Sequence, residues 1–156
     1  MVRIEMEDGG IIEIELLPDA APITAANFEK LAREGFYDGL IFHRVIAGFM
    51  IQGGDPTGTG MGGSKENIKG EFAVNGVDNP ISHKRGVVSM ARSQNYNSAS
   101  SQYFIMHADG EFLDGQYAAF GRVVSGMDVV DRIAATRTSF GDRPVAEQRM
   151  KKVTVI

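Results

Sequence analysis

The chain has 156 residues, 43% of them hydrophobic, so a single domain over residues 1–156 with its own core is expected, and disorder is not. The net charge is −4 without a block of Lys or Arg, which gives no electrostatic case for binding nucleic acid or a membrane surface. Cysteine is absent, which excludes disulfides and thiolate chemistry, and the expected compartment is the cytoplasm.

The first elements are a predicted β-hairpin and a helix. Residues 2–6 alternate apolar and charged side chains, and residues 12–16 repeat this pattern after an Asp-Gly-Gly turn. Pro22 then opens a helix that is predicted to run to about Glu34.

Most of the remaining chain predicts short strands. A second helix is predicted to start at Ser125, with Asp128 as its capping-box partner. About eight strands and two helices, without regular βα alternation, predict a mainly β protein: a closed eight-stranded antiparallel β-barrel capped by two α-helices. The further strand candidates are residues 41–46, 49–52, 86–92, 103–107, 117–124 and 151–156.

Several motifs that could carry chemistry are better explained as ordinary structure. Residues 58–63, GTGMGG, fit a dinucleotide-binding pattern, but the polar SKENIKG that follows indicates a surface loop rather than an apolar helix. Ser98, Ser100 and Ser101 lie outside any nucleophile-elbow motif. No metal or cofactor is therefore expected, and an enzyme built from this chain should need neither a nucleophile nor an acid–base pair.

The three histidines, His43, His83 and His107, are predicted to be structural or superficial. None has another His, Asp or Glu at metal-ligand spacing on a shared helix face. His43 precedes Arg44 on a predicted strand, so the two side chains are expected to face opposite ways.

Strand alternation leaves two explanations for a lone arginine in an apolar run. Arg44 should share a face with Phe42 and Ile46, while Met50 shares one with Gln52. If Arg44, Gln52 and Gln102 face outward, they bring Met50 and Phe104 with them and form an apolar patch with polar edges, a surface suited to binding. Alternatively, Arg44 pairs with a carboxylate at a strand edge. Periodicity alone does not separate these explanations.

The segment FHRVIAGFMIQGGD, residues 42–55, resembles the signature of the cyclophilin family of peptidyl-prolyl cis–trans isomerases. Other segments follow in the family's order, so the resemblance spans essentially the whole chain. It implies proline isomerisation in a groove on the outer wall of a barrel. The further matching segments are NFEKLAREGFYDGLIFHRV, GVVSMAR, SSQYFI, FLDGQYAAFGRVVSGMDVV and KKVTVI.

The resemblance also implies roles for individual residues. Arg44 would be the catalytic residue, acting on proline-containing peptides and on unfolded or folding proteins. The remaining substrate-binding positions would be Phe49, Met50, Gln52, Gly60, Ala91, Arg92, Gln102, Phe104, Phe112, Leu113 and Tyr117.

Three positions depart from the pattern common in eukaryotic cyclophilins. Phe112 stands where many members have Trp, Tyr117 where many have His, and Arg92 where many have Asn. The set resembles prokaryotic cytoplasmic members and predicts that cyclosporin binds only weakly. The alternative function is a non-catalytic proline-peptide binding or chaperone module, in which the same groove binds without accelerating rotation.

Overall fold

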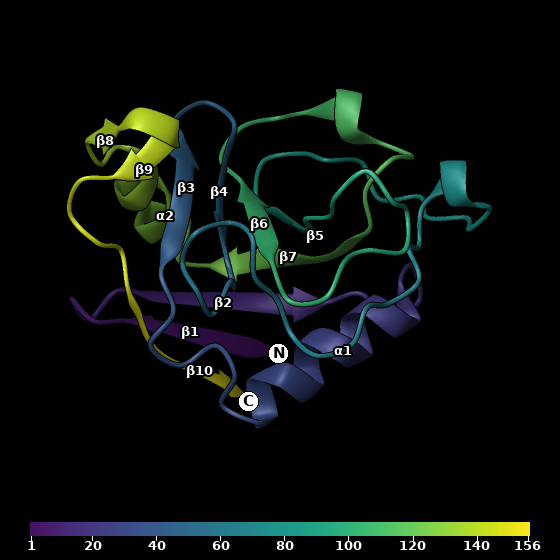
Figure 1. Cartoon of the computed structure of the whole chain (residues 1–156), viewed down its shortest axis with the longest axis horizontal. Coiled ribbons are helices and arrows are strands. Elements are labelled where there is room, and N and C mark those ends of the chain that lie inside the picture. Colours follow the sequence, from purple (N-terminus) through teal and green to yellow (C-terminus); the bar gives the residue numbers. More distant parts are fainter.

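The computed structural model describes all residues, 1–156, and its main element is one curled antiparallel sheet (Figure 1). The strand order is β10-β1-β2-β7-β5-β6-β4-β3. The strands are β1 (Val2–Met6), β2 (Ile11–Leu16), β3 (Phe42–Ile46), β4 (Met50–Gly53), β5 (Val87–Met90), β6 (Tyr103–Met106), β7 (Ala119–Ser125) and β10 (Met150–Val155).

The two α-helices and the short elements near the C-terminus contact different parts of this sheet. Helix α1 contacts β10 and β7, whereas α2 contacts β2, β3 and β4, and the two helices lie at opposite ends of the molecule in Figure 1. No helix is both long and apolar enough to cross a membrane. The elements outside this sheet are α1 (Pro22–Arg33), η1 (Ala73–Asn75), η2 (Glu111–Leu113), α2 (Met127–Ala134), β8 (Thr138–Ser139), η3 (Phe140–Asp142) and β9 (Arg143–Pro144).

The predicted eight-stranded antiparallel sheet and two helices are confirmed, but the predicted closure is wrong. The edge strands β3 and β10 form no ladder, and the chain segments before them meet at one corner through a single bridge, Ile41 to Arg149. The free edge of β3 is instead covered by β9 and η3. An exposed strand edge must be paired or covered. The β8–β9 pair and η3 cover the edge of β3 without closing the sheet, which is therefore a half-barrel.

The core packs side chains of the sheet against both α1 and α2. It is a cluster of 27 buried hydrophobic residues that draws on both ends of the chain. Phe28 of α1 lies 5.1 Å from Tyr37 and from Tyr103 and 5.0 Å from Phe120, measured between ring centroids. Such aromatic packing stabilises a core beyond the area that it buries.

Helix α1 begins at Pro22 as predicted, but its N-terminus is capped from far along the chain. No side chain of its own caps it. The buried carboxylate of Glu71 accepts hydrogen bonds from the main-chain N–H groups of Ile23 and Thr24, at 3.2 and 2.6 Å. A helix N-terminus presents unpaired N–H groups and a positive dipole end, so an anion there stabilises the helix.

The predicted capping box of the second helix is wrong. Ser125 is the last residue of β7, where it pairs with Glu13, and α2 starts at Met127. Gly126 forms the N-cap with φ +95, and no side chain makes a capping bond. A Cβ at this position would collide with the main-chain oxygen of Ile11, so the tight strand-to-helix corner needs glycine.

Candidate functional site

A second, smaller hydrophobic cluster lies apart from the core. Ile51, Tyr103 and Ile105 point into the core, whereas the alternate residues Met50 and Phe104 belong to the smaller cluster. The predicted division of faces along β4 and β6 is therefore confirmed. The smaller cluster consists of Met50, Val87, Phe104, Met106, Leu113 and Ala119.

Along β3 the predicted alternation fails at one point. The register between β3 and β4 shifts between Phe42 and Arg44, and Phe42 lies in the core together with Val45. Arg44 is exposed and lies opposite Gln52, while Ile46 packs against the smaller cluster. A β-bulge inserts one extra residue into a strand, so it re-aims the side chains on either side of it.

Arg44 has no carboxylate partner among the ion pairs of the chain, which rules out the strand-edge explanation for it. Its Nη1 donates to Oε1 of Gln52 at 3.2 Å, and Nε2 of Gln52 donates to Oε1 of Gln102 at 2.9 Å. Nε2 of Gln102 donates in turn to the carbonyl oxygens of Gly60 and Gly62, at 3.0 and 2.8 Å. Two amide side chains thus orient the guanidinium and leave its charge uncompensated.

The buried carboxylate of Asp55 holds the loop that ends this chain of hydrogen bonds. Its Oδ2 accepts from the N–H groups of Gly60 and Gly62 at 2.6 and 3.1 Å, and its Oδ1 accepts from the N–H and hydroxyl of Thr57, both at 2.8 Å. Burial alone would raise the pKa of Asp55, but these hydrogen bonds outweigh it and lower the pKa to about 2.

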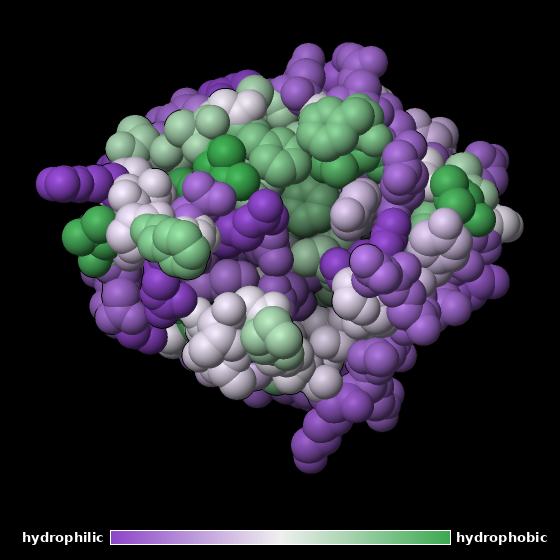
Figure 2. Space-filling model, turned by 45° about the horizontal axis from the view of Figure 1, so that its top comes forward, coloured by the Kyte–Doolittle hydropathy of each residue, from purple (hydrophilic) through white to green (hydrophobic).

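Two adjoining cavities lie along these residues, and the face in Figure 2 is hollowed with hydrophobic side chains on one side and hydrophilic ones on the other. The smaller, about 150 Å³, is lined mainly by hydrophobic residues. The larger, about 440 Å³, is mainly polar, and both include Gln52, Ala91 and Arg92. The smaller cavity is lined by Arg44, Phe49, Met50, Gln52, Ala91, Arg92, Phe104, Leu113 and Tyr117.

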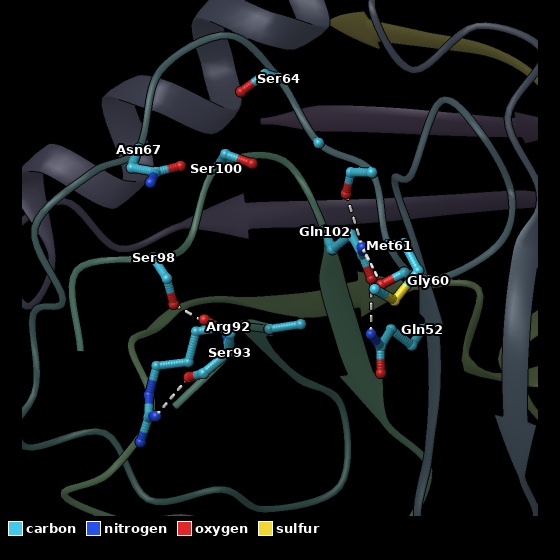
Figure 3. Close-up of a pocket in the computed structure, with 13 residues that line it drawn as sticks. Gln52, Gly60, Met61, Ser64, Asn67, Arg92, Ser93, Ser98, Ser100 and Gln102 are labelled. Carbon is cyan, nitrogen blue, oxygen red and sulfur yellow. Dashed lines mark hydrogen bonds between the residues drawn. The ribbon is translucent and has the colours of Figure 1, made fainter. Parts of the chain in front are cut away.

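The larger cavity is shown in Figure 3. Gln52 and Gln102 lie on one side, next to the loop that carries Gly60, and Ser98 and Arg92 lie on the other. The structure therefore brings eleven of the predicted site residues, Arg44 included, to the two cavities. Phe112 alone lines neither: it is 67% exposed, and its ring centroid lies 5.6 Å from that of Phe49.

Arg92 is held by an aromatic cage. Its guanidinium lies 5.0 Å from the ring centroid of Phe72, 5.1 Å from that of Tyr96 and 4.5 Å from that of Tyr117. It also donates to the carbonyl oxygen of Gln116, at 2.7 Å from Nη2. A guanidinium stacks on aromatic faces in a way that an Asn side chain does not, so Arg92 and Tyr117 form one packed unit beside the smaller cavity.

A hydrogen-bonded trio that sequence reasoning missed lies behind the smaller cavity. Nδ1 of His83 is 2.9 Å from Oδ1 of Asp114, and its Nε2 is 2.9 Å from Oγ of Ser89. The imidazole stacks on Phe104, with ring centroids 6.1 Å apart. Burial lowers the pKa of His83, although Asp114 opposes the shift. His83 and Ser89 are fully buried, so this trio supports the cavity wall and cannot attack a substrate.

His43 is buried and lines neither cavity, whereas Arg44 is exposed and lines the smaller one, so the two side chains do not share a face. The bulge turns its ring toward the loop of the larger cavity, where a Cβ on Gly60 would lie 3.6 Å from Nε2. The side chain is buried and Nδ1 has no hydrogen-bond partner. Burial lowers the pKa of His43, which keeps the ring neutral beneath the loop.

Known proteins resemble this chain in sequence and in fold. Residues 1–155 match the family described as cyclophilin type peptidyl-prolyl cis-trans isomerase/CLD. The chain is 44% identical to a peptidyl-prolyl cis-trans isomerase of Schizosaccharomyces pombe, over 100% of both chains. It is 52% identical to peptidyl-prolyl cis-trans isomerase B of Bacillus subtilis, over 79% of this chain and 82% of that protein.

A solved structure agrees with these matches. It is a Cryptosporidium parvum cyclophilin type peptidyl-prolyl cis-trans isomerase in the presence of the dipeptide Ala-Pro, with a TM-score of 0.90 and 32% identity, and the match covers 99% of this chain and 98% of that one. The chain therefore belongs to the cyclophilin family of peptidyl-prolyl cis–trans isomerases, enzymes that interconvert the two forms of the peptide bond before proline.

Proposed function

We propose that this isomerase acts on X-Pro bonds in the smaller cavity, with Arg44 as the catalytic residue. The observation that carries the proposal is that Arg44 lines an apolar cavity with its charge uncompensated and its guanidinium oriented by Gln52. A peptide bound over this cavity displaces water from the exposed guanidinium, and the charged donor then interacts strongly with a developing lone pair.

The reaction needs only a charged donor and a pocket for the proline ring, because no covalent bond is broken. Amide conjugation gives a rotation barrier of roughly 18–20 kcal/mol, and an uncatalysed X-Pro bond takes tens to hundreds of seconds to isomerise. Twisting the bond localises a lone pair on the prolyl nitrogen. Arg44 donates a hydrogen bond to that nitrogen, or to the substrate's carbonyl oxygen, more strongly in the twisted state than in the planar one. A 10⁵-fold acceleration corresponds to about 7 kcal/mol.

The other residues of the groove hold the peptide on either side of Arg44. In this proposal the apolar side chains hold the proline ring while the rest of the peptide turns. Gln52 and Gln102 bind the peptide backbone, with Ala91 and Arg92 along the groove and Gly60 in the larger cavity. Phe112 and Tyr117 form the rim. The proline pocket is formed by Phe49, Met50, Phe104 and Leu113.

The substrates that we propose are proline-containing segments of unfolded or folding proteins. The Cryptosporidium structure was determined in the presence of the dipeptide Ala-Pro, which supports a proline-peptide ligand for this groove. The proposal treats residues 1–156 as one isomerase domain, which the family match over residues 1–155 supports. The cytoplasmic location stays a prediction, and fractionation of cells that express the chain would test it.

The decisive experiment separates catalysis from binding at Arg44. In a protease-coupled assay on a short X-Pro peptide, Arg44→Ala should lower kcat/KM by roughly 10²–10³, the scale of losing a transition-state donor. Arg44→Lys should recover little, because a point charge lacks the planar fork of the guanidinium. Arg33→Ala, an exposed arginine of α1, is the matched control and should keep full activity.

Peptide affinity is measured on the same variants by fluorescence anisotropy. Arg44→Ala should bind within about threefold of the parent chain, because ground-state contacts come mainly from the apolar pocket. A folded Arg44→Ala protein with near-full activity would remove Arg44 from the mechanism. Equal losses of affinity and of kcat/KM would make it a binding residue only.

A further inference from the structure

The proline pocket includes Phe49, which sits in the turn between β3 and β4. The turn is closed by a hydrogen bond from the N–H of Phe49 to the carbonyl of Ile46, at 3.0 Å. Gly48 has φ +78, which a residue with a Cβ adopts at a cost. Phe49 therefore reaches the cavity from a short loop, and its position depends on what fixes that loop.

His107, one residue beyond β6, holds this turn through two hydrogen bonds, one from its side chain and one from its main chain. Its side chain accepts a hydrogen bond from the N–H of Gly48, at 2.8 Å to Nδ1. Its main-chain N–H donates to the carbonyl oxygen of Phe49, at 2.9 Å. The side-chain bond is formed only while Nδ1 carries no proton, because Gly48 supplies the hydrogen.

Asp131 and Arg85 favour a proton on the other ring nitrogen of His107, Nε2. Oδ1 of Asp131, on α2, lies 3.2 Å from Nε2 of His107, so the carboxylate accepts a proton held there. Asp131 is itself held by both terminal nitrogens of Arg85, at 2.7 and 2.8 Å. Hydrogen bonding from Arg85 lowers the pKa of Asp131, which keeps the carboxylate ionised. Arg85 also donates to the carbonyl oxygen of His107, at 2.9 Å.

We propose that His107 is a positioning residue for the isomerase reaction: held in the Nε2–H tautomer by Asp131, it fixes the Gly48–Phe49 turn and thereby the Phe49 wall of the proline pocket. This inference rests on the proposed use of that pocket. A carboxylate that fixes the tautomer and orientation of an imidazole is a recurring device in proteins. Here the imidazole holds a main-chain turn instead of a metal or a nucleophile.

Three substitutions of His107 test the contacts of its two ring nitrogens separately. In His107→Asn the side-chain oxygen falls near the position of Nδ1 and can still accept from Gly48. In His107→Gln the polar atoms fall near Nε2, so the contact to Asp131 survives and the Gly48 acceptor is lost. His107→Leu loses both. We expect KM for an X-Pro peptide to rise about fivefold in the Gln and Leu variants, the scale of one lost hydrogen bond, and to stay within twofold in the Asn variant.

The kinetic constants are measured separately, since a wall that contacts the proline ring in both planar and twisted states changes KM and leaves kcat within about twofold. Two further variants serve as the positive and the negative control for the change in KM. Phe49→Ala should raise KM more than any His107 variant. Arg3→Gln, which removes an exposed ion pair with Glu13 between β1 and β2, should leave KM unchanged.

Nuclear magnetic resonance supplies a second readout. The ¹⁵N shifts of His107 should report the Nε2–H tautomer, and the amide proton of Gly48 should move upfield in the Gln and Leu variants but not in the Asn variant. Unchanged KM in His107→Leu, with KM raised in Phe49→Ala, would overturn the role of His107 and leave the pocket intact. Unchanged KM in Phe49→Ala would instead overturn the pocket itself. Equal KM values in the Asn and Gln variants would reduce His107 to a structural residue.

Discussion

Gln52 accepts a hydrogen bond from Arg44 and lies directly opposite it across the β3–β4 pair. The Nε2 of Gln52 is fixed by Gln102, so its Oε1 faces the guanidinium. The neutral amide orients Arg44 without neutralising it, which leaves the charge available to a substrate.

This pairing predicts that Gln52→Glu, a nearly isosteric change, lowers activity. A carboxylate would bind Arg44 about twice as strongly as the amide does and hold it off the substrate. We expect kcat/KM to fall on the order of tenfold, or about 1.4 kcal/mol. The measurement is a double-mutant cycle with Arg44→Ala in the protease-coupled assay. If Gln52→Glu costs as much without Arg44 as with it, the two side chains are not coupled in catalysis.

Cyclosporin should inhibit this enzyme only weakly. Phe112 is exposed at the rim beside Phe49 and lacks the N–H donor that an indole would offer. Phe112→Trp should tighten binding by roughly 1–2 kcal/mol, from one hydrogen bond plus added packing area. Inhibition titrations on both proteins check this. Tight inhibition of the unmodified chain would contradict it.

The activity should not depend on pH between 7 and 9. A guanidinium stays protonated throughout this range. Burial lowers the pKa of both His43 and His83, so these neighbours of the groove stay neutral across it. We expect kcat/KM for a neutral X-Pro peptide to vary by less than about twofold, whereas general acid or base catalysis gives a limb in the profile. The profile is repeated on His43→Gln; an inflection that this substitution abolishes would implicate His43 in the reaction.

Asp55 should stabilise the fold at neutral pH and lose that effect in acid. Its pKa is about 2 in the folded chain, below the ordinary value of 3.8, so its contribution is complete above about pH 4 and disappears as the pH falls toward 2. The shift corresponds to about 2 kcal/mol. Asp55→Asn should therefore lower the free energy of unfolding by about 2 kcal/mol at pH 7, because an amide nitrogen cannot accept from the loop N–H groups.

Urea unfolding at pH 7, 4 and 3 measures this difference. The gap between the parent chain and Asp55→Asn should narrow between pH 4 and pH 3. Asp19→Asn, at an exposed position, is the control and should change the unfolding free energy little at any of these pH values. A gap that stays constant with pH would show that the loop does not depend on the ionised carboxylate.

Local sequence patterns were enough to predict which face most side chains of β4 and β6 occupy and where α1 begins and ends. Alternation with period two is a local property, so Met50 and Gln52 could be separated from Ile51 without knowing what lies across the sheet. Pro22 and Gly35 bound the helix through their own backbone preferences. The motif around Arg44 resembled a known family, and that resemblance pointed to the groove.

Features that depend on partners distant in the chain could not be predicted from local sequence patterns. The bulge beside Arg44 is set by the register with β4, and the open edge of β3 by the hairpin that covers it. Glu71 caps α1 across 47 residues, and His107 reaches Gly48 across 59. A local pattern constrains which way a side chain points but not what it meets, because that depends on how strands far apart in sequence are brought together.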